Sequence, residues 1–191
     1  MRRKLIIGLF IFLCIFLVTG CEKTKESTKS SNEEISNNNS VVLYFSATGT
    51  TKKIAERIAN ILKSDIIEII PKDEYKPEDL NYNSDCRANR EQKDNNSRPE
   101  IKNTIDVSKY NTIYLGYPIW WGTNPKIILT LLDTYNFENK TIIPFCTSGS
   151  TGIIESVNNL RNYNNKLNIK DGKRFSINDS DEVIKEFINN N

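Results

Sequence analysis

The chain has 191 residues, of which 38% are hydrophobic and 26% charged, a composition that suits one packed domain and excludes a wholly disordered chain. Its formal charge of +2 gives no basic field for nucleic acid, so we expect no nucleic-acid partner. It contains no histidine, which excludes Ser-His-Asp and Cys-His catalysis and every His-ligated metal site, and we expect no metal.

The N-terminus has the pattern of an export signal. Basic residues at positions 2–4 precede an apolar run at 5–18, which as a helix would span about 21 Å, less than a bilayer core of about 30 Å. Residues 18–21, Val-Thr-Gly-Cys, resemble a bacterial lipoprotein cleavage box, which implies cleavage before Cys21 and lipidation of its sulfur. An ordinary signal peptide and an uncleaved anchor are the alternatives. We expect an exported protein, held by lipid on the extracytoplasmic face of the cell membrane.

We expect three segments: a lipoprotein signal peptide at 1–20, a lipid-anchored tether at 21–40 and a domain at 41–191. Between residues 22 and 40 the only large apolar residue is Ile35, so this segment cannot bury enough surface to offset its ordering entropy. Removal of residues 1–20 leaves 23 positive and 24 negative side chains. The domain keeps Cys86 and Cys146, which we expect to be a free thiol and a small core residue, although a disulfide between them is an alternative.

Strands and helices alternate along the domain. Apolar runs predict strands at 41–45, 66–70, 112–116, 141–145 and, more briefly, 167–169. Apolar residues at helical spacing predict helices at 52–63, from Asn124-Pro125 onward, at 151–160, and after a capping box of Asp179 and Glu182. This alternation predicts an α/β fold, a doubly wound parallel sheet with helices on both faces. Ligands of such sheets bind beyond the carboxyl ends of the strands.

The first strand is followed by a hydroxyl-rich loop. Residues 46–51 supply four hydroxyls, one glycine and a run of backbone N–H groups at a helix N-terminus. These groups bind an anion without any basic side chain. The loop is neither a Walker A motif nor a G-x-G-x-x-G fingerprint. A Ser/Thr-rich helix cap is the alternative interpretation.

The third strand is followed by Tyr-Pro-Ile-Trp-Trp-Gly at 117–122, which contains both tryptophans of the chain. Because adjacent side chains tend to diverge, we expect one indole to pack inward and the other to offer a stacking surface for a flat ring. Alternatively, both indoles cover the helix that follows.

The fourth strand is followed by residues 147–152, Thr-Ser-Gly-Ser-Thr-Gly. Their small side chains and backbone donors suit the close approach of a planar polar ligand, although a plain strand-to-helix turn would have the same composition. The three loops together indicate a site for a mononucleotide with a large flat ring.

With these motifs the sequence closely resembles the flavodoxin superfamily. Residues 42–58 fit its phosphate-loop signature, including Ser46, Gly49 and Thr51. Residues 85–99, 117–122 and 148–150 are similar to a bacterial flavodoxin-like subfamily, so the resemblance covers about 41–189.

The resemblance implies a five-stranded sheet in the order 2-1-3-4-5 and non-covalent FMN as the cofactor. The phosphate would be held by Ser46, Thr48, Gly49, Thr50 and Thr51. The flavin would be lined by Pro118, Ile119, Trp120, Trp121 and Gly122, with one of the two indoles stacked on the ring. Its pyrimidine edge would meet Thr147, Ser148, Gly149 and Gly152.

Two features depart from many flavodoxins. The charge balance of residues 21–191 is close to neutral, whereas a strongly acidic surface guides basic redox partners. The loop at 147–152 has no aromatic residue, which leaves one face of the flavin open for a hydride donor or a quinone.

We therefore expect an electron carrier that exchanges electrons with a redox partner protein or with a small-molecule reductant or oxidant. An FMN-dependent NAD(P)H:quinone oxidoreductase is the alternative, and a binding module without a redox role is the third hypothesis. The connection at 71–111 is long for such a fold; we interpret it as a solvated surface loop, or else as a segment that wraps the sheet edge near the cofactor.

Overall fold

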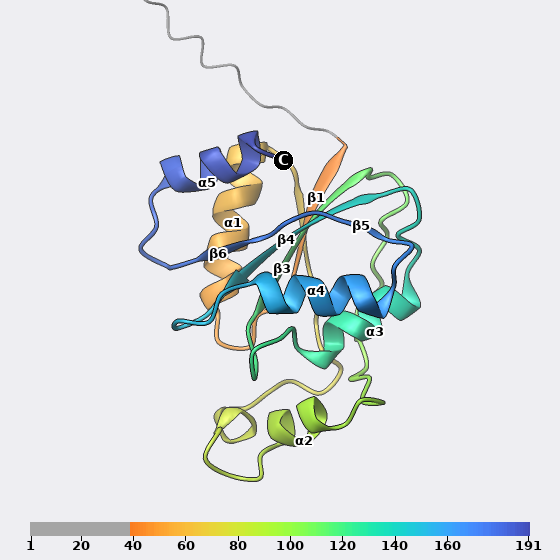
Figure 1. Cartoon of the computed structure of the whole chain (residues 1–191), viewed down its shortest axis with the longest axis vertical. Helices are drawn as coiled ribbons and strands as arrows, with labels where there is room; N and C mark the ends of the chain where they lie inside the picture. Colours follow the sequence, from red (N-terminus) through yellow and green to blue (C-terminus); the bar gives the residue numbers. More distant parts are fainter. Residues whose placement is uncertain (1–38) are drawn as a thin grey trace, which may run out of the picture. The chain divides into compact units, whose positions relative to one another are not determined.

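The computed structural model describes residues 39–191, so the predicted export signal, Cys21 and nearly all of the predicted tether lie outside the described residues. The described part alternates strands with helices along the chain (Figure 1). The strands are β1 (Ser40–Tyr44), β2 (Asp65–Glu68), β3 (Thr112–Pro118), β4 (Thr141–Thr147), β5 (Asn168–Ile169) and β6 (Lys173–Phe175). The helices are α1 (Thr50–Leu62), α2 (Arg87–Lys93), α3 (Lys126–Thr134), α4 (Ile154–Tyr163), α5 (Asp181–Asn189) and the short 3-10 helix η1 (Pro77–Leu80).

The strands pair in parallel in the order β2-β1-β3-β4-β5, which confirms the predicted fold and strand order. The fifth position of the sheet is divided in two. β5 pairs with the start of β4, and β6, which the sequence did not predict, pairs with the end of β4 from Phe145 to Thr147. β6 was missed because only Phe175 of its three residues is buried, so it shows no apolar run.

Alternating side chains divide the core between the two faces of the sheet. In β1, Val41 and Leu43 join one buried cluster, and Val42 and Tyr44 join the other. This alternation is the two-residue period of a strand that is covered on both sides.

Helices α1 and α5 cover one face, and α3 and α4 cover the other (Figure 1). The guanidinium of Arg57 joins α1 to α5 through Asp181, with nitrogen–oxygen distances of 2.9 and 2.7 Å. The predicted capping box at the start of α5 is wrong: the N-cap is Ser180, and the Asp179 carboxylate instead accepts a hydrogen bond from the backbone N–H of Ser176 at 2.9 Å.

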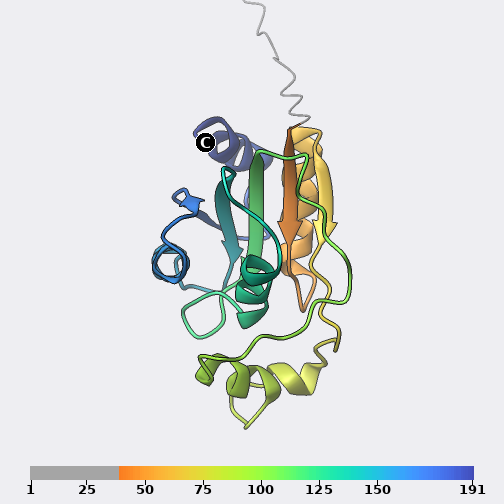
Figure 2. The same cartoon turned by 90° about the vertical axis from the view of Figure 1, so that its right-hand side faces the viewer.

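The connection at residues 71–111, called the excursion below, is folded rather than a plain loop. It contains η1 and α2, and its first residue, Pro71, forms an antiparallel bridge with Ile101. Figure 2 shows its helical part, η1 and α2, below the sheet, on the side toward which the strand arrows point. This part therefore lies beyond the carboxyl ends of the strands, where a parallel sheet binds its ligands.

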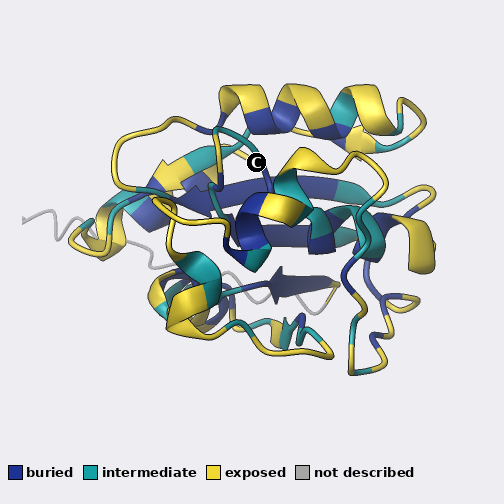
Figure 3. Cartoon of the chain, turned by 90° about the horizontal axis from the view of Figure 1, so that it is seen from below, coloured by how far each residue is buried: buried dark blue, intermediate teal, exposed yellow. Residues whose placement is uncertain are grey.

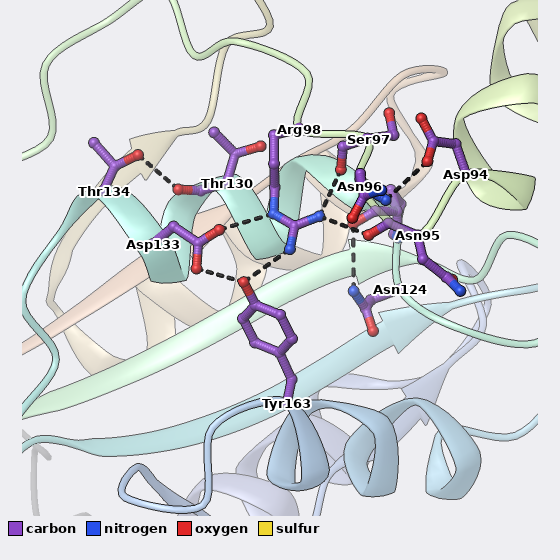
Figure 4. Close-up of polar contacts among 11 residues, drawn as sticks. Asp94, Asn95, Asn96, Ser97, Arg98, Asn124, Thr130, Asp133, Thr134 and Tyr163 are labelled. Atoms are coloured by element: carbon purple, nitrogen blue, oxygen red, sulfur yellow. Dashed lines mark hydrogen bonds and ion pairs between the residues drawn. The ribbon is translucent and has the colours of Figure 1, made fainter.

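A polar cluster ties the excursion to two helices (Figure 4). Arg98 donates from Nε to Asp133 of α3 at 2.8 Å and from a terminal nitrogen to the Tyr163 hydroxyl of α4 at 2.9 Å. The Tyr163 hydroxyl in turn donates to Asp133 at 2.5 Å. Three segments far apart in sequence thus share one hydrogen-bonded junction.

Viewed from below, buried strand segments lie between helices whose outward sides are exposed (Figure 3). Within residues 39–191, no helix has both the length and the apolar character needed to cross a bilayer.

Gly116, in the centre of the sheet, leaves room for the ring of Phe145. A Cβ atom at position 116 would lie 2.2 Å from a ring carbon of Phe145, which is a severe overlap. We expect Gly116→Ala to lower the free energy of unfolding by about 1–3 kcal/mol, measured by chemical denaturation. Gly149→Ala, where an added Cβ meets nothing within 4 Å, is the control and should have little effect. Equal stability of the two variants would contradict the packing argument.

Candidate functional site

A pocket of about 550 Å³ opens at the carboxyl ends of β1, β3 and β4. None of the residues that line it carries a formal charge. Eight of them are residues predicted from the sequence: Thr48, Thr50, Pro118, Ile119, Trp120, Thr147, Ser148 and Gly149. The predicted residues Ser46, Gly49, Thr51, Trp121, Gly122 and Gly152 are outside this lining.

The loop after β1 presents backbone and hydroxyl groups at the start of α1. Gly49 is the N-cap, and its φ of 83° is a left-handed conformation that glycine adopts readily. No side chain caps this helix end, so its first N–H groups are available to a ligand. Thr48 and Thr50 line the pocket, while the buried hydroxyl of Ser46 has no hydrogen-bond partner in the structure.

Thr51 has a different role from its exposed neighbours. Its buried hydroxyl lies 2.8 Å from the hydroxyl of Thr147 at the end of β4. The two loops are therefore joined directly, across the end of the intervening strand β3.

The two tryptophans diverge, as predicted. Only 4% of Trp120 is exposed, whereas 41% of Trp121 is exposed. Trp120 and Thr123 exchange backbone hydrogen bonds of 2.9 and 3.1 Å, which close a tight turn between them. Within that turn Trp121 has a φ of 49° and Gly122 a φ of 83°, so both central residues are left-handed.

Trp120 belongs to a cluster of perpendicular aromatic rings. Its ring centroid lies 5.6 Å from that of Phe45 and 5.0 Å from that of Tyr75 in the excursion. The Tyr75 hydroxyl donates to the carboxylate of Glu91, and burial together with that carboxylate raises the pKa of Tyr75. The tyrosine therefore stays neutral. Trp120, packed between Phe45 and Tyr75, forms part of the pocket wall.

The loop after β4 supplies small groups, as its composition indicates. The Ser148 hydroxyl donates to the carbonyl of Thr151, and the Ser148 carbonyl accepts from Arg174 at 3.3 Å. The backbone N–H of Ile119 donates to the Thr147 carbonyl at 3.0 Å. The loops after β3 and β4 thus contact each other through backbone groups rather than through bulky side chains.

The remaining wall was not predicted. Tyr82 and Leu80 reach the pocket from the excursion, and Phe175, Ser176 and Ile177 reach it from β6 and the turn that follows. Tyr82 is 54% exposed and packs on Trp121, with ring centroids 4.4 Å apart. An isolated tyrosine in a polar segment was a weak signal, because its neighbours in space are set by the folding of the excursion.

The comparisons with known proteins agree with this geometry. The profile of the family described as Flavodoxin matches residues 39–191. The chain belongs to the flavodoxin family. None of the curated protein sequences matches the chain.

Three solved structures are similar to the chain. A protein provisionally described as a flavoprotein from Bacteroides eggerthii is 34% identical, with a TM-score of 0.77 over 80% of this chain and 97% of its own. One so described from Bacteroides uniformis is 35% identical, with a TM-score of 0.76 over 80% and 99%. The flavoprotein from Lactobacillus acidophilus, solved in complex with FMN, is 28% identical, with a TM-score of 0.58 over 80% and 99%.

Within residues 39–191, no three Cys, Asp or Glu side chains are grouped closely enough to hold a metal ion. Both cysteines of this part are free and buried, Cys146 within β4 and Cys86 at the N-cap of α2. Cys146 is a core residue, as expected.

Burial raises the pKa of the Cys146 thiol to about 12, partly offset by Arg174. Because the thiolate is the reactive form, we expect iodoacetamide at pH 8 to leave Cys146 unmodified in the native protein. In denaturant, where a thiol has its ordinary pKa near 8.5, Cys146 should be alkylated readily. Peptide mapping by mass spectrometry separates Cys146 from the other cysteines. Rapid native labelling, or a peptide disulfide-linked to Cys86, would contradict this prediction.

Proposed function

We propose that this protein binds FMN in the pocket at the carboxyl ends of β1, β3 and β4 and carries electrons. The observation that carries the proposal is that three loops converge on one pocket. The first loop is rich in hydroxyls, the second carries aromatic side chains, and the third has small side chains. The predicted cofactor, FMN, agrees with the family and with the Lactobacillus acidophilus relative that was solved with it.

The loop after β1 fits the phosphate of FMN. The uncapped N-terminus of α1 points N–H groups at its ligand, and the dipole of the helix favours a negative charge there. The unpartnered Ser46 hydroxyl is the kind of buried polar group that calls for a ligand or water. Thr48 and Thr50 add two exposed hydroxyls from the same loop. We assign Ser46, Thr48, Gly49 and Thr50 to the phosphate, and Thr51 to the positioning of this loop against Thr147.

The rest of the pocket fits a flat ring with a polar edge. Pro118, Ile119 and Trp120 form an apolar wall, and Tyr82 and Phe175 add aromatic surface. Ser148 and Gly149 leave backbone groups near the ring edge without side-chain bulk. The flavin, when bound, supplies the redox chemistry, while these residues hold it and exclude water. We assign Trp121 and Gly122 to the shape of the turn, with Trp121 supporting Tyr82.

We further propose that the protein acts outside the cell, attached to the membrane through lipid on Cys21. The Val-Thr-Gly-Cys box at residues 18–21 supports this placement, with the polar segment behind it serving as a tether. The near-neutral charge of residues 21–191 favours a redox partner that docks without strong electrostatic steering, either a protein or a small molecule.

An FMN-dependent NAD(P)H:quinone oxidoreductase is the second candidate. It is favoured by the loop at 147–152, which has no aromatic side chain to cover the flavin from that side. Gly149 and the three residues that follow it are exposed, so a substrate could approach there.

The phosphate assignment is tested by comparing FMN with riboflavin, which lacks the phosphate. Several charge-assisted hydrogen bonds to phosphate should make FMN bind about a hundredfold more tightly, measured by quenching of flavin fluorescence. Thr50→Val, which removes one exposed hydroxyl while keeping the side-chain shape, should weaken FMN binding about tenfold. Its affinity for riboflavin should stay as in the wild type. A wild-type protein that binds neither flavin would overturn the proposed function.

Anaerobic mixing of the FMN-loaded protein with NADH or NADPH distinguishes the two candidates. For an electron carrier we expect the visible absorption of the flavin to persist for minutes, because the phosphate of FMN would already occupy the loop after β1 and no charged lining residue offers a second site for the phosphates of the nucleotide. Dithionite, which needs no binding site, is the positive control and should bleach the flavin. Rapid bleaching by either nucleotide would favour the oxidoreductase.

A further inference from the structure

A side chain of the excursion holds the turn that carries both tryptophans. Gln92, in α2, donates from Nε2 to the carbonyl oxygens of Trp120 and Asn124, each at 3.2 Å. Its Oε1 accepts from the backbone N–H of Lys126 at 3.1 Å. Rotating the amide by 180° would place its oxygen against two carbonyls, so these three partners fix its orientation.

The turn held in this way is conformationally demanding. Trp121 lies between Trp120 and Gly122 with a φ of 49°, a region that bulky residues seldom occupy. Such a conformation persists where surrounding contacts maintain it. The bond from Gln92 to the Trp120 carbonyl is a contact of this kind from outside the turn.

Gln92 also completes the start of α3. Pro125 is the N-cap and makes no side-chain hydrogen bond, and the first helical N–H, that of Lys126, has no acceptor within its own helix. The Gln92 oxygen is that acceptor. One amide therefore links the end of the pocket wall to the helix that follows it.

The ring of Trp120 is held from the same helix by a separate route. Tyr75 packs edge-on against it, and the guanidinium of Arg87 lies 4.2 Å from the centroid of the Tyr75 ring. Arg87 pairs with Glu91 at 2.6 Å, and Glu91 accepts the Tyr75 hydroxyl. Helix α2 thus acts on both the carbonyl and the ring of one wall residue.

We propose that Gln92 is a positioning residue for the flavin site. It does not line the pocket, and it acts through the Trp120 carbonyl by keeping the wall of Pro118, Ile119 and Trp120 in the conformation that receives the ring. This inference rests on the proposed function, because it assigns Gln92 a part in flavin binding.

The test compares two variants of Gln92 with a matched control. Gln92→Leu removes all three hydrogen bonds, whereas Gln92→Glu keeps the shape and an oxygen for Lys126 but loses the donors to the two carbonyls. The control is Asn103→Leu, which removes another amide clamp of the excursion. Asn103 donates to the Glu68 carbonyl at 2.8 Å and accepts from the N–H of Ile70 at 3.0 Å.

We expect both Gln92 variants to bind FMN about tenfold more weakly and to change the visible circular dichroism of the bound flavin. Asn103→Leu should lower the melting temperature of the flavin-free protein about as much as the Gln92 variants do. It should nevertheless keep FMN affinity within about twofold of the wild type and leave the flavin spectrum unchanged.

Each outcome bears on the proposal. Wild-type affinity and spectrum in Gln92→Glu, or an equal loss of affinity in Asn103→Leu, would overturn it while leaving the proposed function intact. If Gln92→Leu does not fold, Gln92→Glu decides the question, since it conserves volume. A wild-type protein that binds no FMN would overturn the proposed function and this inference with it.

Discussion

The parallel pairing of β3 with β1 and β4 determines where the three predicted loops of the site lie. Gly116 pairs with Tyr44 on one side and with Phe145 on the other, and Pro118 pairs with Thr147. Because the three strands end at the same edge in register, the loops that follow them meet there without any covalent link. The buried contact between the Thr51 and Thr147 hydroxyls joins the outer two of these loops.

The pocket would bind a charged phosphate although none of its lining side chains is charged. Its lining is neutral, so a phosphate would be held by N–H groups, hydroxyls and the dipole of α1. Such groups are preorganised by the backbone, whereas lysine side chains would have to be ordered on binding. Because none of the lining residues is charged, stacking and hydrogen bonds are the means by which the lining itself would influence the cofactor.

The fold and eight of the thirteen residues that line the pocket could be predicted because their signals are local. An apolar run such as Val41–Phe45 identifies a buried strand, and the hydroxyls of Thr48 and Thr50 directly follow it. Tyr82 and Phe175 could not be placed, because each reaches the pocket only through long-range folding. β6 depends on pairing with β4, and α2 has few apolar residues of its own, so neither shows the periodicity that identifies an element.

Helix α2 buries little surface of its own, which explains why the excursion and the site depend on each other. Only Ala88 and Asn89 of this helix are buried, which is too little apolar surface to hold a seven-residue helix in place. Its position is instead maintained by side-chain contacts with its surroundings. Arg87 and Glu91 contact Tyr75, which packs on Trp120, and Gln92 donates a hydrogen bond to the Trp120 carbonyl. The same contacts that hold the excursion in place also hold the wall of the pocket, so we expect a displacement of the excursion to change the conformation of the wall. A segment that reads as a polar surface loop therefore becomes part of the structural support of the binding site.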